Sequence, residues 1–197
     1  MPNPEATSSQ PAPRLVIFWG MTASGKSTLA QAWAEQHGAP YFNTDRVRKE
    51  LVGLQATDRR PDGIGQGIYT AELSAQTYQE MLNRAQQGFA TGATTVVLDG
   101  SYSRRADRDA VRLWARAMAV RTIFFYFCCS PEVTRQRLAL REVDSTAVSD
   151  GRWEIYQYQQ GSFELPDAAE PDCIILPTEA PVTELLKQLA AQPSLQD

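Results

Sequence analysis

The sequence is poor in several residue types, and each scarcity excludes a class of protein. Only three of its 197 residues are cysteine, an odd number whose spacing gives no disulfide framework, so we expect a reducing, cytoplasmic compartment. The single histidine, His37, precedes Gly38, a position that favours the last turn of a helix over a catalytic role. The longest apolar run covers seven residues, 123–129, far below the ~20 that a membrane-spanning helix needs.

Lysine is also scarce. Only Lys26, Lys49 and Lys187 are lysine, so 19 − 3 = 16 of the basic residues are arginine. The net charge of −4 argues against a protein that coats nucleic acid, because phosphate neutralisation needs a basic surface. An apolar fraction of 43% is that of an ordinary globular protein. Residues 1–13 hold four prolines and no apolar core, so we expect one domain, 14–190, between tails at 1–13 and 191–197.

Between these tails, short apolar runs alternate with helical patterns. The runs are nearly continuous, which is typical of strands buried on both faces of a parallel sheet; they cover residues 15–19, 41–43, 94–98, 122–128 and 173–176. The helical patterns cover residues 26–37, 45–54, 70–89, 104–119, a stretch from 131, 152–160 and 182–189. This alternation predicts a three-layer α/β sandwich whose ligands bind at the carboxyl ends of the strands. The polar stretch 142–151 lies between two helices, so we expect it to move.

A glycine-rich octapeptide, GMTASGKS at residues 20–27, carries the strongest chemical signal. It has the spacing of a phosphate-binding loop, with Gly20 and Gly25 five residues apart and Lys26 and Ser27 behind them. In such a loop the backbone N–H groups surround phosphate oxygens, the lysine contacts the β- and γ-phosphates, and the serine hydroxyl binds Mg²⁺. The sequence therefore predicts a site for ATP and Mg²⁺, whose further nucleotide-binding residues are Thr22, Ala23, Ser24 and Thr28.

Two aspartates follow apolar runs. Asp99 ends the run 94–98, which is the position of a Walker B carboxylate beside Mg²⁺, although aspartate also ends strands for turn chemistry. Asp45 follows the second run, where it could accept a proton from an attacking hydroxyl or orient it. Arg48 lies one helical turn later, on the same side as Asp45. The alternative is that Asp45 only caps the second helix, and the residues alone leave both readings open.

Arginines gather in two later segments. A stripe at four-residue spacing, residues 104, 108, 112 and 116, is typical of a solvated helix face. Arg104 and the neighbouring Arg105 follow the third strand most closely and are candidates to reach a substrate. Arg137 and Arg141 lie on the helix that leads into residues 142–151. An arginine on a closing lid can stabilise a transferring phosphoryl group, and Arg137 and Arg141 are the candidates for this role. The alternative is that they form ordinary surface ion pairs.

Together these motifs resemble the predicted-kinase family of small bacterial P-loop proteins, relatives of zeta toxins and of the kinase domain of polynucleotide kinases. The resemblance extends over about residues 14–178, and its matching stretches are 20–28, 44–51, 67–70, 97–102 and 148–150. It implies a five-stranded parallel sheet in the order 2-3-1-4-5 with a lid at 142–151. It also implies that Arg137 or Arg141 touches the phosphates of ATP and that Asp45 activates the substrate hydroxyl. Gly100-Ser101 departs from the threonine or asparagine that many relatives carry after the strand-three aspartate.

We therefore expect an ATP-dependent kinase that transfers the γ-phosphate to a hydroxyl of a small molecule, with Lys26, Asp45 and Arg141 as catalytic residues. The expected Mg²⁺ ligands are Ser27 and Asp99. The residues that we expect to bind the acceptor are Asp45, Arg48, Tyr102, Arg104 and Arg105. The alternatives are a 5′-hydroxyl polynucleotide kinase, a zeta-like nucleotide-sugar kinase, and an ATP-binding regulatory switch. The acidic composition makes nucleic acid a less favoured partner, and no membrane partner is expected.

Overall fold

The structure, a computed structural model, describes residues 12–60, 62–144, 146 and 148–196, so nearly all of the expected tail at 1–13 lies outside the described residues. The described chain contains a parallel sheet of five strands in the order β2-β3-β1-β4-β5, which is the order that the resemblance implied. The strands are β1 (Arg14–Gly20), β2 (Tyr41–Asn43), β3 (Thr95–Gly100), β4 (Arg121–Cys128) and β5 (Cys173–Pro177). Each apolar run of the sequence is therefore a strand.

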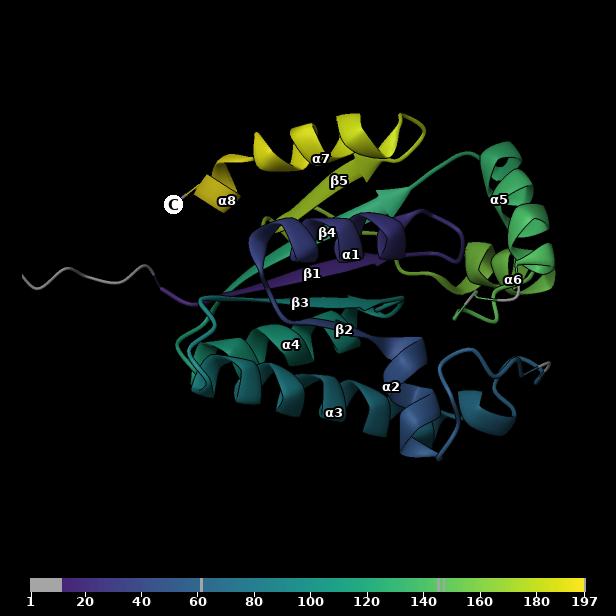
Figure 1. Ribbon diagram of the computed structural model, residues 1–197, viewed down its shortest axis with the longest axis horizontal. Helices are drawn as coiled ribbons and strands as arrows, with labels where there is room; N and C mark the ends of the chain where they lie inside the picture. Colours follow the sequence, from purple (N-terminus) through teal and green to yellow (C-terminus); the bar gives the residue numbers. More distant parts are fainter. Residues whose placement is uncertain (1–11, 61, 145, 147, 197) are drawn as a thin grey trace, which may run out of the picture.

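Helices cover both faces of the sheet and the carboxyl ends of its strands (Figure 1). One face carries α1 (Lys26–His37) and α7 (Val182–Ala190), and the other carries α3 (Ala71–Ala90) and α4 (Arg105–Ala117). At the carboxyl ends lie α2 (Thr44–Leu51), α5 (Pro131–Val143) and α6 (Trp153–Ser162). This arrangement confirms the predicted three-layer sandwich. No helix in the described ranges is long and apolar enough to cross a membrane.

The central strand β1 shows how a continuous apolar run builds both layers of the core. Val16 and Phe18 pack against side chains of α1 and α7. Leu15, Ile17 and Trp19 point to the other face and pack against side chains of α3 and α4. All five are fully buried. Because successive side chains alternate across a strand, an uninterrupted apolar sequence serves both faces at once.

Two differences from the predictions exceed two residues. Helix α2 ends at Leu51 rather than at 54, because Gly53 adopts φ +72° and the amide of Leu54 turns back to donate to the carbonyl of Lys49. Where a frayed tail was expected from residue 191, a short helix, α8 (Pro193–Gln196), follows α7. Its carbonyl oxygens accept hydrogen bonds of 2.6 Å from arginine side chains at the start of β1 and of β4.

Candidate functional site

The loop between β1 and α1, residues 20–27, forms a cradle of backbone N–H groups. Gly20 has φ +151°, and a Cβ there would lie 2.3 Å from the carbonyl oxygen of Phe127, so the close approach of β1 and β4 admits only glycine. Ala23 at φ +57° and Gly25 at φ +89° adopt the left-handed region, a backbone conformation that is typical of anion-binding loops. Gly25 precedes α1 without a side-chain cap among the described residues, so the first N–H groups of α1 are available to an anion.

Four charged side chains act on one another at this cradle. The Lys26 Nζ donates to the Met21 carbonyl at 3.3 Å, so the lysine folds back over the loop. Burial lowers the pKa of Lys26, the Asp99 carboxylate opposes that shift, and Arg141 and Asp45 act on it in opposite directions. Burial also lowers the pKa of Arg141, against the same two aspartates. Lys26, Asp45, Asp99 and Arg141 thus lie near enough for their charges to act on one another.

Asp99 is fully buried at the carboxyl end of β3. Its Oδ2 accepts hydrogen bonds from the Tyr41 hydroxyl at 2.7 Å and from the Asn43 side-chain amide at 2.6 Å. Its Oδ1 is buried and has no hydrogen-bond partner among the described residues. A buried carboxylate oxygen without a partner is costly to leave unsatisfied. It is therefore a ready ligand for a cation at the mouth of the cradle.

Asp45 lies in the first turn of α2 but does not cap this helix. The cap is Asn43, whose side chain accepts a hydrogen bond of 3.1 Å from the amide of Arg46. The Asp45 Oδ1 instead accepts from the Arg48 Nη1 at 3.0 Å, and 22% of the Asp45 side chain stays exposed. The capping alternative is therefore wrong, and part of the carboxylate stays accessible.

Gly100 explains how α2 comes so close to the end of β3. A Cβ at Gly100 would lie 2.6 Å from the Cγ2 of Thr44, the first residue of α2. A threonine or asparagine there would push α2 away from the strand. The departure seen in the sequence therefore has a packing role, because it keeps Asp45 beside the strand end that carries Asp99.

Arg48 lies between Asp45 and an aromatic ring. It is 7% exposed, and its guanidinium carbon lies 4.9 Å from the centroid of the Tyr69 ring in the 3₁₀ turn η1 (Gly67–Tyr69). Its buried Nε has no partner within the described part of the chain. A guanidinium held in place with an unused N–H is suited to bind an anionic group of a ligand.

Lys49, the next residue, is fully buried and ties two distant segments to α2. Its Nζ donates to the carbonyls of Ala56 at 3.1 Å and Val148 at 2.7 Å, and it pairs with the Asp150 carboxylate at 3.2 Å. The same carboxylate accepts a hydrogen bond of 2.8 Å from the Tyr69 hydroxyl. We call the described residues of 52–69 and 144–152 the cap. Sequence reasoning missed Lys49, Tyr69 and Asp150 as a set, although each lies in a stretch that matches the family.

Helix α6 packs against the phosphate-binding loop. The Thr22 amide donates to the Gln159 Oε1 at 2.7 Å, and a Cβ at Gly151 of the cap would lie 1.9 Å from the Thr22 hydroxyl oxygen. Ala23 packs with side chains of α5 and α6, among them Tyr156. The segment expected to be a lid is thus closed against the loop in this structure. Gln159 lies in a glutamine-rich helix, so no local pattern distinguishes it from its neighbours.

Arg137 and Arg141 differ in their surroundings. Arg137 donates to the Ala23 carbonyl at 3.2 Å and to both the hydroxyl and the carbonyl of Thr178, and the Thr178 hydroxyl donates to the Ser24 carbonyl. Arg137 therefore braces the loop from its outer side. The Arg141 side chain has no hydrogen-bond or ion-pair partner within the described residues, so of the two it is the one free to take a ligand.

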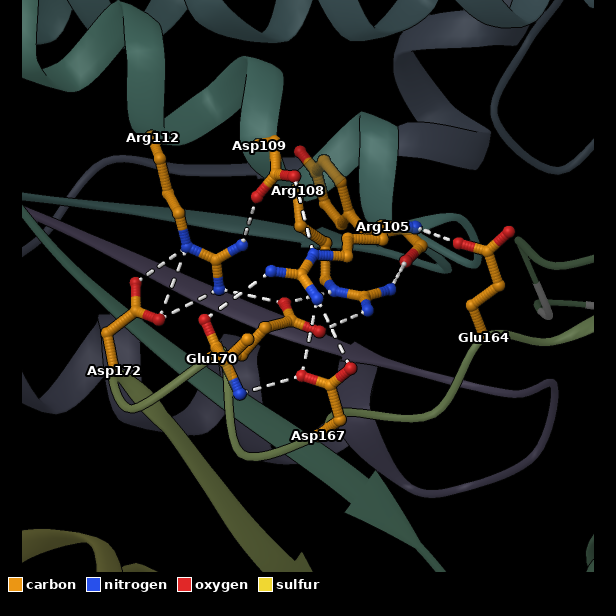
Figure 2. Close-up of polar contacts among 10 residues, drawn as sticks. Arg105, Arg108, Asp109, Arg112, Glu164, Asp167, Glu170 and Asp172 are labelled. Atoms are coloured by element: carbon orange, nitrogen blue, oxygen red, sulfur yellow. Dashed lines mark hydrogen bonds and ion pairs between the residues drawn. The ribbon is translucent and has the colours of Figure 1, made fainter.

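The arginine stripe on α4 is solvated only at its ends, Arg104 and Arg116, so the expectation of a solvated face is wrong for Arg108 and Arg112. Arg108 is fully buried, its guanidinium carbon lies 4.2 Å from the centroid of the Trp19 ring, and it pairs with Glu170 at 2.5 Å. Arg112 pairs with Glu170 at 2.9 Å and with Asp172 at 2.8 Å. Figure 2 shows these side chains converging from α4 on the segment that precedes β5. Arg108 and Arg112 therefore hold residues 170–172 against α4.

Two further candidates are turned toward other partners. Arg105 points to the same segment (Figure 2), where its guanidinium pairs with Asp167 at 3.2 Å and its amide donates to Glu164. Arg104 is exposed and pairs with Asp107 at 3.1 Å. The structure does not bring either arginine to the carboxylates of the cradle.

Tyr102 is a buried wall beside the site. It is 1% exposed and adopts φ +42°, an uncommon conformation for a bulky residue. Its ring stacks on Tyr78 at 4.7 Å between centroids, and its amide donates to the Tyr78 hydroxyl at 3.2 Å. Its own hydroxyl is buried without a partner among the described residues. A strained turn with an unsatisfied hydroxyl is typical of a ligand-binding position.

These residues fit ATP and Mg²⁺. The uncapped amides and the two cations suit a chain of phosphates, and the open oxygen of Asp99 with the hydroxyl of Ser27 supplies the oxygen ligands that Mg²⁺ takes. Ser27 lies in the first turn of α1, next to Lys26. Thr28 follows at the surface.

Comparison with known sequences gives a family and a set of longer relatives. The sequence model of the AAA domain family matches residues 15–166. The uncharacterized protein Rv2004c of Mycobacterium tuberculosis is 30% identical over 128 residues, which are 65% of this chain and 26% of the relative. Mb2027c of Mycobacterium bovis matches to the same extent. The chain thus spans about a quarter of the length of these relatives.

Comparison with solved structures shows the fold. A sugar kinase from Janibacter sp. HTCC2649 has a TM-score of 0.66 at 20% identity over 93% of this chain and 98% of that one. A gluconokinase from Sinorhizobium meliloti 1021 has a TM-score of 0.60 at 21% identity, and the match covers 94% of this chain and 98% of that one. The Mycobacterium tuberculosis APS kinase CysC, solved with AMPPNP and APS, has a TM-score of 0.61 at 14% identity. This match covers 92% of this chain and 97% of that one. The chain therefore has the fold of small P-loop kinases.

Proposed function

The chain belongs to the AAA domain family, and from this premise we propose that it is an ATP-dependent kinase that transfers the γ-phosphate of ATP to a hydroxyl of a small molecule. Its fold is that of proteins named as sugar, gluconate and APS kinases. The observation that carries the proposal is the phosphate-binding loop with its left-handed turns and the uncapped start of α1. The charges of Lys26, Arg141, Asp45 and Asp99 act on one another beside it.

Each of the four side chains has a separate task in phosphoryl transfer. Lys26 and Arg141 hold the negative charge that spreads over the phosphoryl oxygens, and positioned cations of this kind are the main source of catalysis in this reaction. Asp99 and Ser27 hold Mg²⁺, which when bound offsets charge on the phosphates. Asp45 accepts the proton of the acceptor hydroxyl or orients that hydroxyl for attack. The closed cap keeps water away from the reacting groups.

Arg48 supports an acceptor that carries an anionic group. Its guanidinium lies beside Asp45, stacks on Tyr69, and has an unsatisfied Nε. A bound carboxylate or phosphate would complete its hydrogen bonds and hold the hydroxyl of the same molecule near Asp45. The chemistry around Asp45 therefore favours a hydroxylated organic anion over a neutral sugar.

The test is transfer of labelled γ-phosphate from Mg·ATP to a panel of acceptors: sugar acids, nucleotide sugars, aminoglycosides and 5′-hydroxyl oligonucleotides. We expect transfer to one class, at least ~10²-fold less with Lys26→Ala, because one transition-state donor is lost. Asp45→Asn keeps the shape of the side chain and should also abolish transfer. Full activity of the Lys26→Ala protein would overturn the proposal.

The same experiment also tests two alternatives, a polynucleotide kinase and an ATP-driven switch. A polynucleotide kinase needs unpaired basic residues along its strand, and the arginine stripe on α4 does not supply them, because Arg108 and Arg112 pair with carboxylates. An ATP-driven switch would hydrolyse ATP without an acceptor and tolerate the loss of Arg48. A kinase should hydrolyse ATP slowly alone and lose transfer in Arg48→Ala.

A further inference from the structure

A cavity lies between α5 and the cap. Its volume is about 590 Å³, within the range of sites for small molecules, and it is bounded by α5, by the start of α6 and by residues of the cap. No residue of the phosphate-binding loop lines it. Its walls carry five arginines: Arg59, Arg60, Arg135, Arg141 and Arg152.

The charge of this cavity is strongly positive, although the chain as a whole is acidic. The acidic residues in its walls are Glu142, Asp150 and Glu154. Asp150 is already paired with Lys49 at 3.2 Å. Five arginines against the two remaining carboxylates leave 5 − 2 = 3 positive charges.

The arginines of the cavity are unpaired, unlike those of α4. None of the five has a carboxylate within ion-pair distance among residues 12–60, 62–144, 146 and 148–196, whereas Arg108 and Arg112 each have at least one. The chain has more acidic than basic residues, so it contains enough carboxylates to pair with all of its arginines. The arginines that line this cavity nevertheless have no such ion pair among the described residues. They are therefore available to an external anion.

Several contacts hold these arginines at the cavity. The Arg59 Nη2 donates to the carbonyls of Arg141 at 3.0 Å and Asp144 at 2.5 Å. The Arg152 Nη2 donates to the Asp62 carbonyl at 2.8 Å. These carbonyl contacts fix the guanidinium groups without neutralising their charge.

The start of α6 adds an aromatic wall and free amides. The Arg135 guanidinium carbon lies 4.2 Å from the centroid of the Trp153 ring. Helix α6 begins at Trp153 without a side-chain cap among the described residues. Its first N–H groups thus add to the positive field at this wall.

We infer that this cavity is a binding site for a phosphate-bearing small molecule, separate from the ATP cradle and joined to it through Arg141. Three excess positive charges match one or two phosphate groups, and guanidinium groups fit phosphate oxygens in pairs. Arg141 lines the cavity and also acts on Asp45 and Asp99. A ligand bound here therefore touches the arginine that faces the transfer site.

The test is a titration of the protein saturated with Mg·AMPPNP, so that the ATP cradle is filled. Inorganic phosphate is added at constant ionic strength against chloride, and the indole N–H resonance of Trp153, assigned with Trp153→Phe, is followed by NMR. We expect a saturable shift with phosphate and none with chloride. The double variant Arg135→Glu/Arg152→Glu should bind phosphate at least about tenfold more weakly, because two charged partners are reversed.

The matched control is Arg116→Glu, an exposed arginine on α4, which should bind phosphate like the wild type. An equal shift with chloride, or an unchanged titration in the double variant, would overturn the inference. Because the readout is binding, it does not depend on the proposed kinase activity. Nucleotide-free protein of the Lys26→Ala variant, titrated in the same way, keeps the test valid if AMPPNP does not bind.

The ligand is either the acceptor or a separate effector, and a kinetic arm distinguishes them. If the double variant raises the KM of a phosphorylated acceptor and leaves the KM of ATP unchanged, the cavity holds part of the acceptor. If phosphate changes the transfer rate of the wild type but not of the double variant, with an unphosphorylated acceptor, the cavity holds an effector. Both outcomes support the site.

Discussion

At the scale of single residues, the Asp99 carboxylate has one saturated and one open oxygen. Tyr41 and Asn43 donate to Oδ2, while the buried Oδ1 has no partner in the described chain. Asp99→Asn keeps the shape and the acceptor for Tyr41 but removes the charge. We expect the Mg²⁺ concentration for half-maximal ATP turnover to rise at least about tenfold, with little change in melting temperature.

The control for this prediction is Tyr41→Phe, which removes one donor to Oδ2 and leaves the charge. It should shift the Mg²⁺ dependence less than Asp99→Asn. An Asp99→Asn protein with the Mg²⁺ dependence of the wild type would show that Oδ1 does not face the metal.

At the scale of elements, the sequence predicted strands and helices but not the long-range polar contacts between them. Strands were predictable because each apolar run serves two faces, as the alternation of Val16 and Phe18 with Ile17 shows. Whether Asp45 caps α2 was not predictable from the sequence, because only the structure shows that Asn43 is the N-cap.

The stripe on α4 shows the physical reason for such failures. Arginines at every fourth position give the same sequence pattern whether their side chains face water or a buried carboxylate. The partner of Arg108, Glu170, lies 62 residues further along the chain, in a segment with no periodicity of its own. Local patterns predict elements, whereas pairs of distant charges become visible only when the elements are packed.

The contact between α4 and the segment before β5 gives a prediction on stability. Glu170 is 3% exposed and receives hydrogen bonds from Arg108 and Arg112. Glu170→Gln leaves the buried Arg108 charge without its counter-charge, so we expect the free energy of unfolding to fall by about 3 kcal/mol. Asp167→Asn, in a side chain that is 60% exposed, should cost less than about 1 kcal/mol. Denaturant unfolding of both variants measures the difference.

The same carboxylate gives this stability its pH dependence. Burial alone would raise the pKa of Glu170, but hydrogen bonds from Arg108 and Arg112 outweigh it and bring the pKa below its ordinary 4.5. A lowered pKa in the folded state contributes stability above about pH 4.5 and loses it as the pH falls through the lowered value. Wild-type stability should therefore decline more steeply below that pH than the stability of Glu170→Gln, and equal slopes would contradict this account.

At the scale of the whole molecule, one buried ion pair joins α2 to the cap. Lys49 is fully buried, the Asp150 side chain is 6% exposed, and both segments of the cap also reach Lys49 through the Ala56 and Val148 carbonyls. Tyr69, which lies under Arg48, donates to the same Asp150. The position of the cap and the orientation of Arg48 thus depend on one carboxylate.

Asp150→Asn should therefore open the cap without unfolding the sheet. The variant leaves the Lys49 ammonium buried with carbonyl partners only, which costs a few kcal/mol at that contact. We expect hydrogen exchange to rise at least about tenfold for amides of the cap and to stay unchanged in β1, β3 and β4. Acceptor-dependent transfer should fall, while ATP hydrolysis without acceptor should rise, because an open cap admits water. Glu154→Gln, an exposed neighbour without an ion pair among the described residues, is the matched control. A uniform rise in exchange across the sheet would show instead that Lys49 and Asp150 support the whole fold, and that closure of the cap is set elsewhere.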